Sequence, residues 1–341
     1  MFMSFVRAIA SLCGYFLCLS CVQVFAADKS QSQAVPSLEN YLKPLGYVAV
    51  ALRRGPNNEL RAAVEVAGRK REFMVDTGCT LTMIDTSLKS KFKTPHELGI
   101  SFKDAILGVL DNSEEVIIDE LRFGTARLLN EPALIKALNS SGGSAFADGI
   151  LGCDFLLRHF CLIDCSGLRL FMRSERPREE DRASLERLLN QGSMHCAPLH
   201  QTSALVSTCK AAIDGNPLVL ILDTGSASTM IHSKTAERYK LRTYQTQTPN
   251  KRVGLGTIGN VMPYATRPKL FEVDGVEMPL LGLSLGVTDM SSWNIGAQGD
   301  PLESADGMLG AEFLAVNRGV IDLADRKLWF QAGTRSPVVG K

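Results

Sequence analysis

The chain contains an internal repeat, and this repeat constrains its fold more than any other feature of the sequence. Residues 73–84 (FMVDTGCTLTMI) align without a gap with residues 220–231 (LILDTGSASTMI), and six columns are identical. A second pair of blocks follows in the same order, ADGILGCDFL at residues 147–156 and ADGMLGAEFL at residues 305–314. The sequence therefore predicts a tandem duplication, in which two copies of one folding unit lie in a single chain.

Each copy is long enough to form a lobe with its own core, since the chain has 341 residues and 45% of them are hydrophobic. Residues 173–182 (RSERPREEDR) separate the copies, and their mixed charge is typical of a solvated linker. We therefore predict an N-terminal lobe over residues 40–172, a linker over residues 173–190 that ends in a short helix, and a C-terminal lobe over residues 191–333.

The predicted secondary structure is mostly β. The segments with strand-like patterns and Gly-containing breaks are residues 47–52, 60–66, 72–76, 204–213 and 218–223. Short helices are expected only at residues 86–92 and 234–239, directly after the two repeated loops, and within the linker at residues 183–190. The fold class predicted from these patterns is all-β with few short helices.

The first residues differ from the rest and predict a secretory signal peptide over residues 1–26. Arg7 precedes an apolar run over residues 8–22, and Ala26 ends a small-residue motif suited to cleavage. No later run reaches eighteen apolar residues, so we expect an exported protein, periplasmic or secreted, with no stable membrane insertion after signal removal. An uncleaved anchor, or lipid attachment at Cys21, stays open as an alternative.

Charge and motifs exclude several classes of function. Lys and Arg number 37 against 36 Asp and Glu, so there is no positive field that favours nucleic acid. The chain has no His-Glu-x-x-His motif and no paired Cys-x-x-Cys motif. We therefore expect neither a metal nor an organic cofactor.

The two Asp-Thr-Gly loops are the strongest candidate site. Each follows an apolar strand, and Gly allows a tight turn and close approach, so two such loops can meet tip to tip. Their carboxylates then share one proton and hold a water between an acid and a base, while each Thr hydroxyl reaches across to the opposite loop. A single Asp-Thr-Gly is usually a surface turn, but two copies in matching contexts are not. The candidate catalytic residues are Asp76 and Asp223, with Thr77, Gly78, Thr224 and Gly225 as their support.

With these motifs the chain resembles the aspartic peptidases, and more narrowly the retropepsin-like bacterial aspartyl proteases, with two lobes fused over about residues 40–333. The resemblance implies that the apolar-apolar-Gly segments at residues 150–152 and 308–310 run beside the catalytic loops. It also implies a terminal hairpin in each lobe, at residues 161–171 and 320–330, and an active-site cleft between the lobes. Cys79 departs from the pepsin pattern, in which Ser or Ala usually follows the loop Gly.

The resemblance further implies a β-hairpin flap over the substrate in each lobe. The first-lobe candidate spans residues 106–111 and the second-lobe candidate spans residues 253–259, both Gly-containing and apolar. An ordinary hairpin turn is the alternative for either segment. The candidate substrate-binding residues are Gly108, Val109, Leu255, Gly256 and Thr257.

Six cysteines remain after signal removal, an even number for an oxidising compartment. In the family fold the residue after Asp-Thr-Gly lies close to the residue after apolar-apolar-Gly, which implies a Cys79–Cys153 disulfide. Cys196 and Cys209 flank a predicted hairpin centred near residues 202–203 and are a second candidate pair. Buried thiols that only fill space are the alternative.

The function predicted from the sequence is an exported aspartic endopeptidase that hydrolyses peptide bonds with a water activated between Asp76 and Asp223. Its partner is a peptide or protein substrate, and a monomer is expected because both aspartates lie in one chain. The alternatives are a catalytically silent protein that binds peptides or envelope components on the same fold, and a peptidase restricted to one envelope partner.

Overall fold

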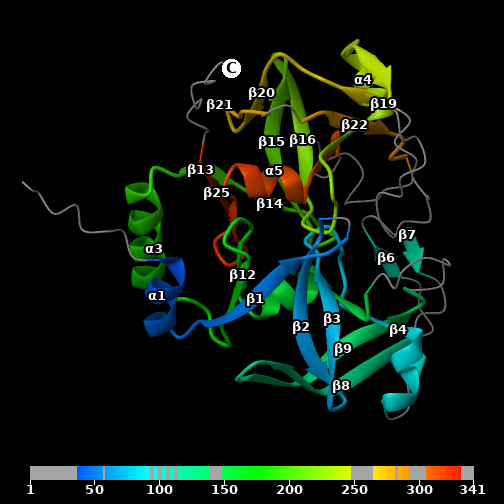
Figure 1. The fold of residues 1–341 in the computed structure, drawn as a ribbon, viewed down its shortest axis with the longest axis vertical. Coiled ribbons are helices and arrows are strands. Elements are labelled where there is room, and N and C mark those ends of the chain that lie inside the picture. The colour runs from blue at the N-terminus through cyan, green and yellow to red at the C-terminus, as the bar shows by residue number, and fades with distance from the viewer. Residues whose placement is uncertain are drawn as a thin grey trace, which may run out of the picture. The chain divides into compact units, whose positions relative to one another are not determined.

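The computed structural model describes most of the chain after the N-terminal segment. The described residues are 37–56, 58–92, 96–97, 102–104, 108–110, 114–138, 147–246, 264–280, 283–291 and 305–331. Within these ranges strands predominate and helices are few and short, so the predicted all-β class is confirmed (Figure 1).

The strands of the first copy form the first lobe. Hydrophobic residues alternate along β2, where Leu60, Ala62, Val64 and Val66 point into the core, so this strand presents one apolar face. The strands are β1 (Val48–Arg54), β2 (Leu60–Val66), β3 (Arg69–Val75), β4 (Met83–Asp85), β5 (His96–Glu97), β6 (Phe102–Asp104), β7 (Gly108–Leu110), β8 (Glu114–Phe123), β9 (Ala126–Lys136), β10 (Gly149–Leu151), β11 (Leu162–Asp164) and β12 (Arg169–Met172).

The strands of the second copy repeat this arrangement around the Asp-Thr-Gly loop. The β15–β16 hairpin corresponds to β2–β3, and β23 lies parallel to β16 as β10 lies parallel to β3. The predicted duplication is therefore a duplication of structure. The strands are β13 (His195–Pro198), β14 (His200–Gln201), β15 (Ser207–Ile213), β16 (Asn216–Leu222), β17 (Met230–His232), β18 (Thr243–Gln245), β19 (Tyr264–Thr266), β20 (Phe271–Val273), β21 (Val276–Glu277), β22 (Leu285–Thr288), β23 (Gly307–Leu309), β24 (Val320–Asp322) and β25 (Lys327–Phe330).

Short helices follow the Asp-Thr-Gly loops and the apolar-apolar-Gly strands in both copies, and the two helices predicted after the Asp-Thr-Gly loops are confirmed. The helices in the described ranges are α1 (Leu38–Leu42), η1 (Lys43–Leu45), η2 (Thr86–Lys91), α2 (Cys153–Arg158), α3 (Glu179–Gln191), α4 (Ser233–Arg238) and α5 (Ala311–Val316). In the described ranges, no helix combines the length and apolar character needed to cross a membrane.

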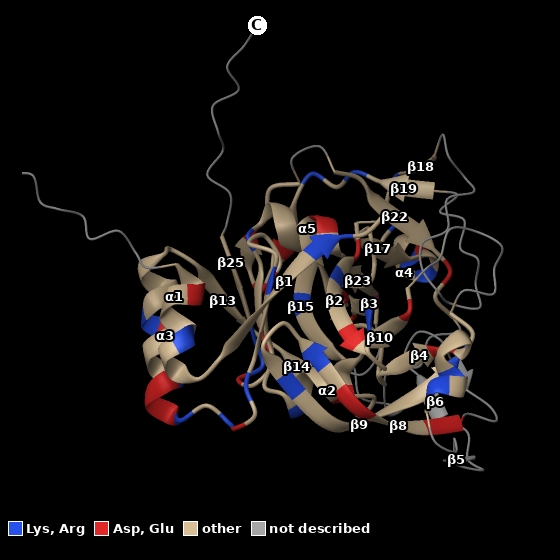
Figure 2. Cartoon of the chain, turned by 60° about the horizontal axis from the view of Figure 1, so that its bottom comes forward, with Lys and Arg blue, Asp and Glu red and all other residues tan. Residues whose placement is uncertain are grey.

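The linker folds into α3, which begins four residues before the predicted helix. Leu185, Leu188 and Leu189 are buried, whereas most charged residues of the linker are exposed, and Figure 2 shows both acidic and basic positions along this helix. Asp181 is an exception, because it is buried and paired with Arg173 and Arg178. The predicted solvated linker is thus largely a packed helix.

One sheet joins the two lobes. The terminal hairpins β11–β12 and β24–β25 are confirmed, and β11 pairs with β24 so that Ile163 lies opposite Ile321. Helices α1 and α3 lie against this sheet (Figure 1), where Leu42 and Leu188 share a core cluster with Trp329. Because this joint uses strands from both copies, neither lobe completes it alone.

A buried carboxyl group lies in this joint. Asp322 ends β24, is 5% exposed and accepts a hydrogen bond from the Asp325 N–H at 3.1 Å. Burial raises the pKa of Asp322 to about 6, and burial together with the Asp322 charge raises the pKa of the nearby Tyr47. The folded protein therefore favours the protonated form of Asp322.

We predict that Asp322 makes the protein less stable as the pH rises. Its folded pKa of about 6 exceeds the ordinary value of 3.8, so its stabilisation is complete below the unfolded pKa and is lost as the pH rises through 6. Between about pH 4 and pH 7 this group should lower the free energy of unfolding by roughly 2 kcal/mol. Urea unfolding of the wild type and Asp322→Asn across this range measures the effect. Equal pH dependence in both proteins would contradict it.

Candidate active site

The two Asp-Thr-Gly loops occupy equivalent places in the two lobes. Asp76 follows β3 and Asp223 follows β16, and the parallel strands β10 and β23 run beside them. The Asp76 N–H donates to the Leu151 carbonyl at 3.1 Å, and the Asp223 N–H donates to the Leu309 carbonyl at 3.0 Å. Each predicted apolar-apolar-Gly segment therefore does run beside an Asp-Thr-Gly loop.

Reciprocal hydrogen bonds join the loops across the lobes. The Thr77 hydroxyl donates to the Leu222 carbonyl at 2.7 Å and accepts from the Thr224 N–H at 3.0 Å. The Thr224 hydroxyl likewise donates to the Val75 carbonyl at 2.7 Å and accepts from the Thr77 N–H at 3.1 Å. Each hydroxyl thus uses both its donor and its acceptor capacity on the opposite loop, as the sequence predicted.

The glycines bring each loop against the opposite carboxylate. A Cβ on Gly78 would lie 2.6 Å from Cγ of Asp223, and a Cβ on Gly225 would lie 2.4 Å from Cγ of Asp76, so no side chain fits at either position. Asp76 accepts from the Gly78 N–H at 2.9 Å, while Asp223 accepts from the N–H groups of Gly225 at 2.8 Å and Ser226 at 2.9 Å. The aspartates, 9% and 4% exposed, are therefore held together where the loops meet.

Acidic residues behind the loops form a second layer of support that sequence analysis missed. Asp154 accepts from the Thr82 N–H at 2.7 Å and hydroxyl at 2.8 Å, and the Thr82 hydroxyl accepts from the Gly152 N–H at 3.2 Å. In the second lobe Glu312 accepts from the Thr229 N–H. Burial raises the pKa of both Asp154 and Glu312. The sequence signal for this support was an acidic residue two positions after the Gly of each apolar-apolar-Gly segment.

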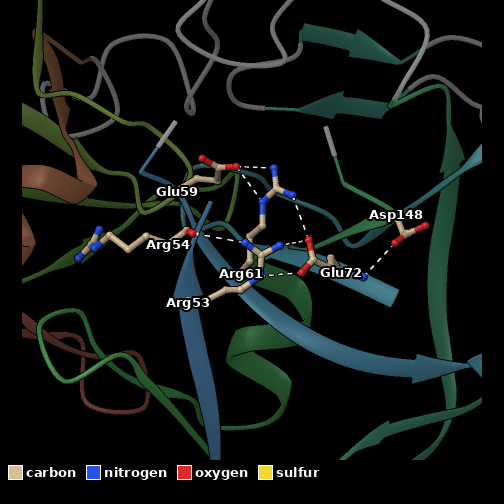
Figure 3. A network of polar contacts seen from close by, with 6 residues as sticks. All are labelled: Arg53, Arg54, Glu59, Arg61, Glu72 and Asp148. Carbon is tan, nitrogen blue, oxygen red and sulfur yellow. Dashed lines mark hydrogen bonds and ion pairs between the residues drawn. The ribbon is translucent and has the colours of Figure 1, made fainter. Parts of the chain in front are cut away.

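A buried ion pair flanks one contact between the lobes (Figure 3). Glu59 and Arg61 are 1% and 5% exposed, and Nε of Arg61 donates to Oε1 of Glu59 at 2.8 Å. Between them, the Leu60 N–H lies 3.4 Å from the Thr224 carbonyl in the catalytic loop of the other lobe. Arg61 also reaches Glu72 on β3 at 3.3 Å, so the pair ties the start of β2 to the neighbouring strand.

The repeated aspartates before the apolar-apolar-Gly segments have structural roles. Asp148 accepts from the Glu72 N–H at 2.9 Å and pairs with Arg71 at 3.2 Å. Asp306 accepts from the Val219 N–H at 3.0 Å. Both carboxylates therefore fix a strand edge and belong to the scaffold.

The expected Cys79–Cys153 disulfide is not formed in this structure, although the two positions are adjacent. The Cys153 N–H donates to the Cys79 carbonyl at 2.8 Å, as the family resemblance implied. Both residues are thiols, however, and their sulfurs point to different acceptors. The Cys79 thiol donates to the Leu81 carbonyl at 3.2 Å, and the Cys153 thiol donates to the Thr77 carbonyl at 3.2 Å.

The expected pairing of Cys196 with Cys209 is wrong. Cys196 lies on β13 in the sheet that joins the lobes, whereas Cys209 lies on β15 in a separate sheet. The hairpin places His200 opposite Thr208, so it is centred further along the chain than predicted and Cys196 lies outside it. Both residues are thiols.

The flap candidates are described only in the first lobe. Gly108 and Val109 lie in β7, the returning strand of a hairpin in which Gly108 is opposite Asp104. Leu255, Gly256 and Thr257 lie outside the described residues. A substrate-binding role for these five residues stays a prediction.

The histidine side chains that the structure describes do not form a set of metal ligands. His159 is buried and its Nε2 lies 2.9 Å from Glu131, while Nδ1 of His232 accepts from the Lys234 N–H at 3.2 Å. Among the residues that the structure describes, no group of three or more His, Cys, Asp or Glu side chains is placed to hold a metal ion.

Comparison with known proteins identifies the family. The family model described as aspartyl protease matches residues 62–155 and 209–313, which is more than half of the chain and one segment in each copy. The chain belongs to the aspartyl protease family. None of the curated proteins compared with the chain matches it.

Solved structures with similar folds have low sequence identity. Conglutin gamma, a basic 7S globulin from lupine seeds, has a TM-score of 0.51 at 10% identity, with 85% of this chain and 95% of that chain covered. An aspartic proteinase from Irpex lacteus gives 0.47 at 13% identity, with 87% and 100% covered, and soybean basic 7S globulin gives 0.46 at 12%, with 87% and 97% covered. The likeness to conglutin gamma supports the two-lobed fold.

We predict that the Thr77 hydroxyl is needed to hold the loops together. Thr77→Val leaves the buried Leu222 carbonyl and Thr224 N–H without this partner, which should lower the free energy of unfolding by about 2 kcal/mol. Thr77→Ser retains the hydroxyl and should cost less than about 1 kcal/mol. Urea unfolding of the three proteins tests this, and equal stability of the Val and Ser variants would refute it.

Proposed function

We propose that the protein is an aspartic endopeptidase whose catalytic dyad is Asp76 and Asp223. The observation that carries this proposal is the reciprocal fixing of both loops, in which each Thr hydroxyl bonds the opposite loop and each Gly lies against the opposite Asp. Two carboxyl groups held together in a buried setting do not ionise independently, and the pair shares one proton. Such a pair holds an acid and a base side by side.

The dyad activates water without a cofactor. The ionised carboxylate draws a proton from the water as the water oxygen attacks the scissile carbonyl carbon, and the protonated carboxyl group donates its proton to the carbonyl oxygen. The two groups then exchange roles: the amide nitrogen takes up a proton as the C–N bond breaks. Because the pair titrates as a unit, the starting charge belongs to the dyad and not to one residue.

Fold membership alone does not establish catalysis, because conglutin gamma, which has a similar fold, is named as a basic 7S globulin. The support for an active enzyme comes from the residues of the site. All six loop positions carry the residues that the dyad needs, and the described hydrogen bonds use them symmetrically.

The sequence supports a proposed location outside the cytoplasm. The apolar segment over residues 8–22 and the motif ending at Ala26 favour export, and the proposed substrate is an extended peptide bound between the lobes. Since one chain supplies both aspartates, we propose that a monomer is the active unit.

We predict that either Asp76→Asn or Asp223→Asn abolishes peptide cleavage. An amide cannot carry the proton that the remaining carboxyl group must exchange, so the turnover number should fall by at least about a thousandfold. Digestion of an unstructured peptide library between about pH 3 and pH 8, followed by mass spectrometry, measures cleavage.

Asp119→Asn is the matched control, because Asp119 is an exposed carboxylate on β8 outside the site. It should retain wild-type turnover. Turnover that persists in either dyad variant would overturn the assignment. Binding of a peptide carrying a hydroxyl in place of the scissile carbonyl, with no cleavage by the wild type, would favour the binding protein instead.

We also predict that specific activity is independent of enzyme concentration. A monomer that carries both loops loses nothing on dilution, whereas a site assembled from two chains dissociates. Activity assays over a hundredfold dilution, with light scattering on the same samples, distinguish the two. Activity that falls steeply with dilution alongside a detected dimer would contradict the prediction.

A further inference from the structure

The two copies carry carboxyl groups with different surroundings behind their Asp-Thr-Gly loops. The second residue after the apolar-apolar-Gly segment is Asp154 in the first lobe and Glu312 in the second. Oδ1 of Asp154 accepts from the Thr82 N–H at 2.7 Å, and Oδ2 lies 3.6 Å from Nη2 of Arg158 on the next turn of α2. Both oxygens of the first-lobe carboxyl group therefore have a partner, and one partner is a cation.

Glu312 lacks this compensation. Its Oε1 accepts from the Thr229 N–H, but its Oε2 is inaccessible to solvent and has no hydrogen-bond partner in the described part of the chain. The residue four positions further along α5, where α2 has Arg158, is Val316. The carboxyl group folds back over Gly310, since a Cβ on that residue would lie 2.7 Å from Oε2.

The surroundings of Glu312 favour its neutral form. A carboxylate that is buried without a cation is costly, and such a group takes up a proton instead. Burial is the main influence on Glu312 and raises its pKa, while hydrogen bonds from Thr229 and from N–H groups of α5 lower the pKa by less. The charged or titratable residues on the neighbouring described elements, none of which forms an ion pair with Glu312, are Asp223, Asp306, His232, Glu59, Arg61 and Arg318.

Glu312 is connected to Asp223 through the backbone of the second-lobe loop. The Ala311 N–H donates to the Ser226 carbonyl at 2.8 Å, and the Ser226 N–H donates to Oδ1 of Asp223 at 2.9 Å. Glu312 itself binds the N–H of Thr229, three residues further along the same loop. The start of α5 therefore holds this loop at two points, and Glu312 supplies one of them.

We propose that Glu312 is a positioning residue that holds the Asp223 loop as a neutral carboxylic acid, and that its ionisation loosens this loop. The effect on catalysis rests on the peptidase function proposed above, whereas the effect on the loop does not. Because the folded pKa lies above the ordinary value of 4.5, the stabilisation is complete below that value and is lost as the pH rises through the folded pKa. The loop of the first lobe, whose carboxyl group has Arg158, should respond less.

Amide hydrogen exchange of the segment over residues 220–231, followed by mass spectrometry, tests the proposal without reference to catalysis. Glu312→Gln keeps a similar shape and an acceptor for the Thr229 N–H but cannot ionise. After correction for the intrinsic exchange rate, protection in the wild type should fall relative to this variant by at least about threefold between about pH 5 and about pH 8.

Glu237→Gln is the matched control, because Glu237 is an exposed glutamate on α4 of the same lobe. Its exchange should follow that of the wild type at every pH. Equal pH dependence of exchange in the wild type and Glu312→Gln would overturn the proposal.

Kinetics at acid pH distinguish a neutral acid from a required carboxylate. At about pH 4, Glu312→Gln should retain kcat within about twofold, whereas Glu312→Ala, which leaves the Thr229 N–H without its acceptor, should lose kcat by at least about tenfold with a smaller change in KM. A Gln variant as impaired as the Ala variant would contradict the neutral form. If the wild type cleaves no peptide, the peptidase proposal fails, and the exchange measurement still decides the role of Glu312.

Discussion

The reciprocal hydrogen bonds of Thr77 and Thr224 are the constraint on which the rest of the site depends. Both residues are almost fully buried, so each unmade bond would leave a backbone group unsatisfied in a low-dielectric setting. The bonds fix one loop against the other, and only then does each Gly place its neighbouring backbone against the opposite Asp. The proposed dyad therefore depends on the contact between the copies and not on either copy alone.

The lobes make a second contact where β11 pairs with β24 and helices α1 and α3 cover the sheet. Burial of Leu185, Leu188 and Leu189 on α3 contributes apolar contacts worth roughly 2 kcal/mol per side chain. The linker thus stabilises the joint as well as connecting the lobes. Two separate contacts resist relative movement of the lobes better than the loops alone, which is what a dyad dependent on sub-ångström geometry requires.

Sequence analysis predicted the features that short segments encode. The pairing of the two Asp-Thr-Gly loops follows from local patterns that the repeat supplies twice, whereas the apolar strands beside them and the terminal hairpins follow from the family resemblance. The β11–β24 pairing and the Glu59–Arg61 ion pair were not predicted, because they join residues whose proximity depends on the finished fold. The Cys196–Cys209 pairing failed for a related reason. Cys196 is near the hairpin in sequence, but β13 leaves it to pair with β25 in another sheet.

The two copies are alike at the dyad and differ around it, and the geometry explains this distribution. Alignment on the catalytic Asp places Val206 and Thr208 where the first lobe has Glu59 and Arg61. At the Asp-Thr-Gly loops, each Thr bonds the backbone of the opposite loop. A substitution in one copy would therefore leave groups of the other copy without a hydrogen-bond partner. Outside the loops this reciprocal bonding does not constrain the two copies, so their sequences can differ. A peptide has a direction, so the two halves of the proposed substrate would meet different lobes. Two identical lobes would offer both halves the same surroundings, whereas the fused and diverged lobes of this chain would allow the proposed peptidase distinct recognition on each side of the scissile bond.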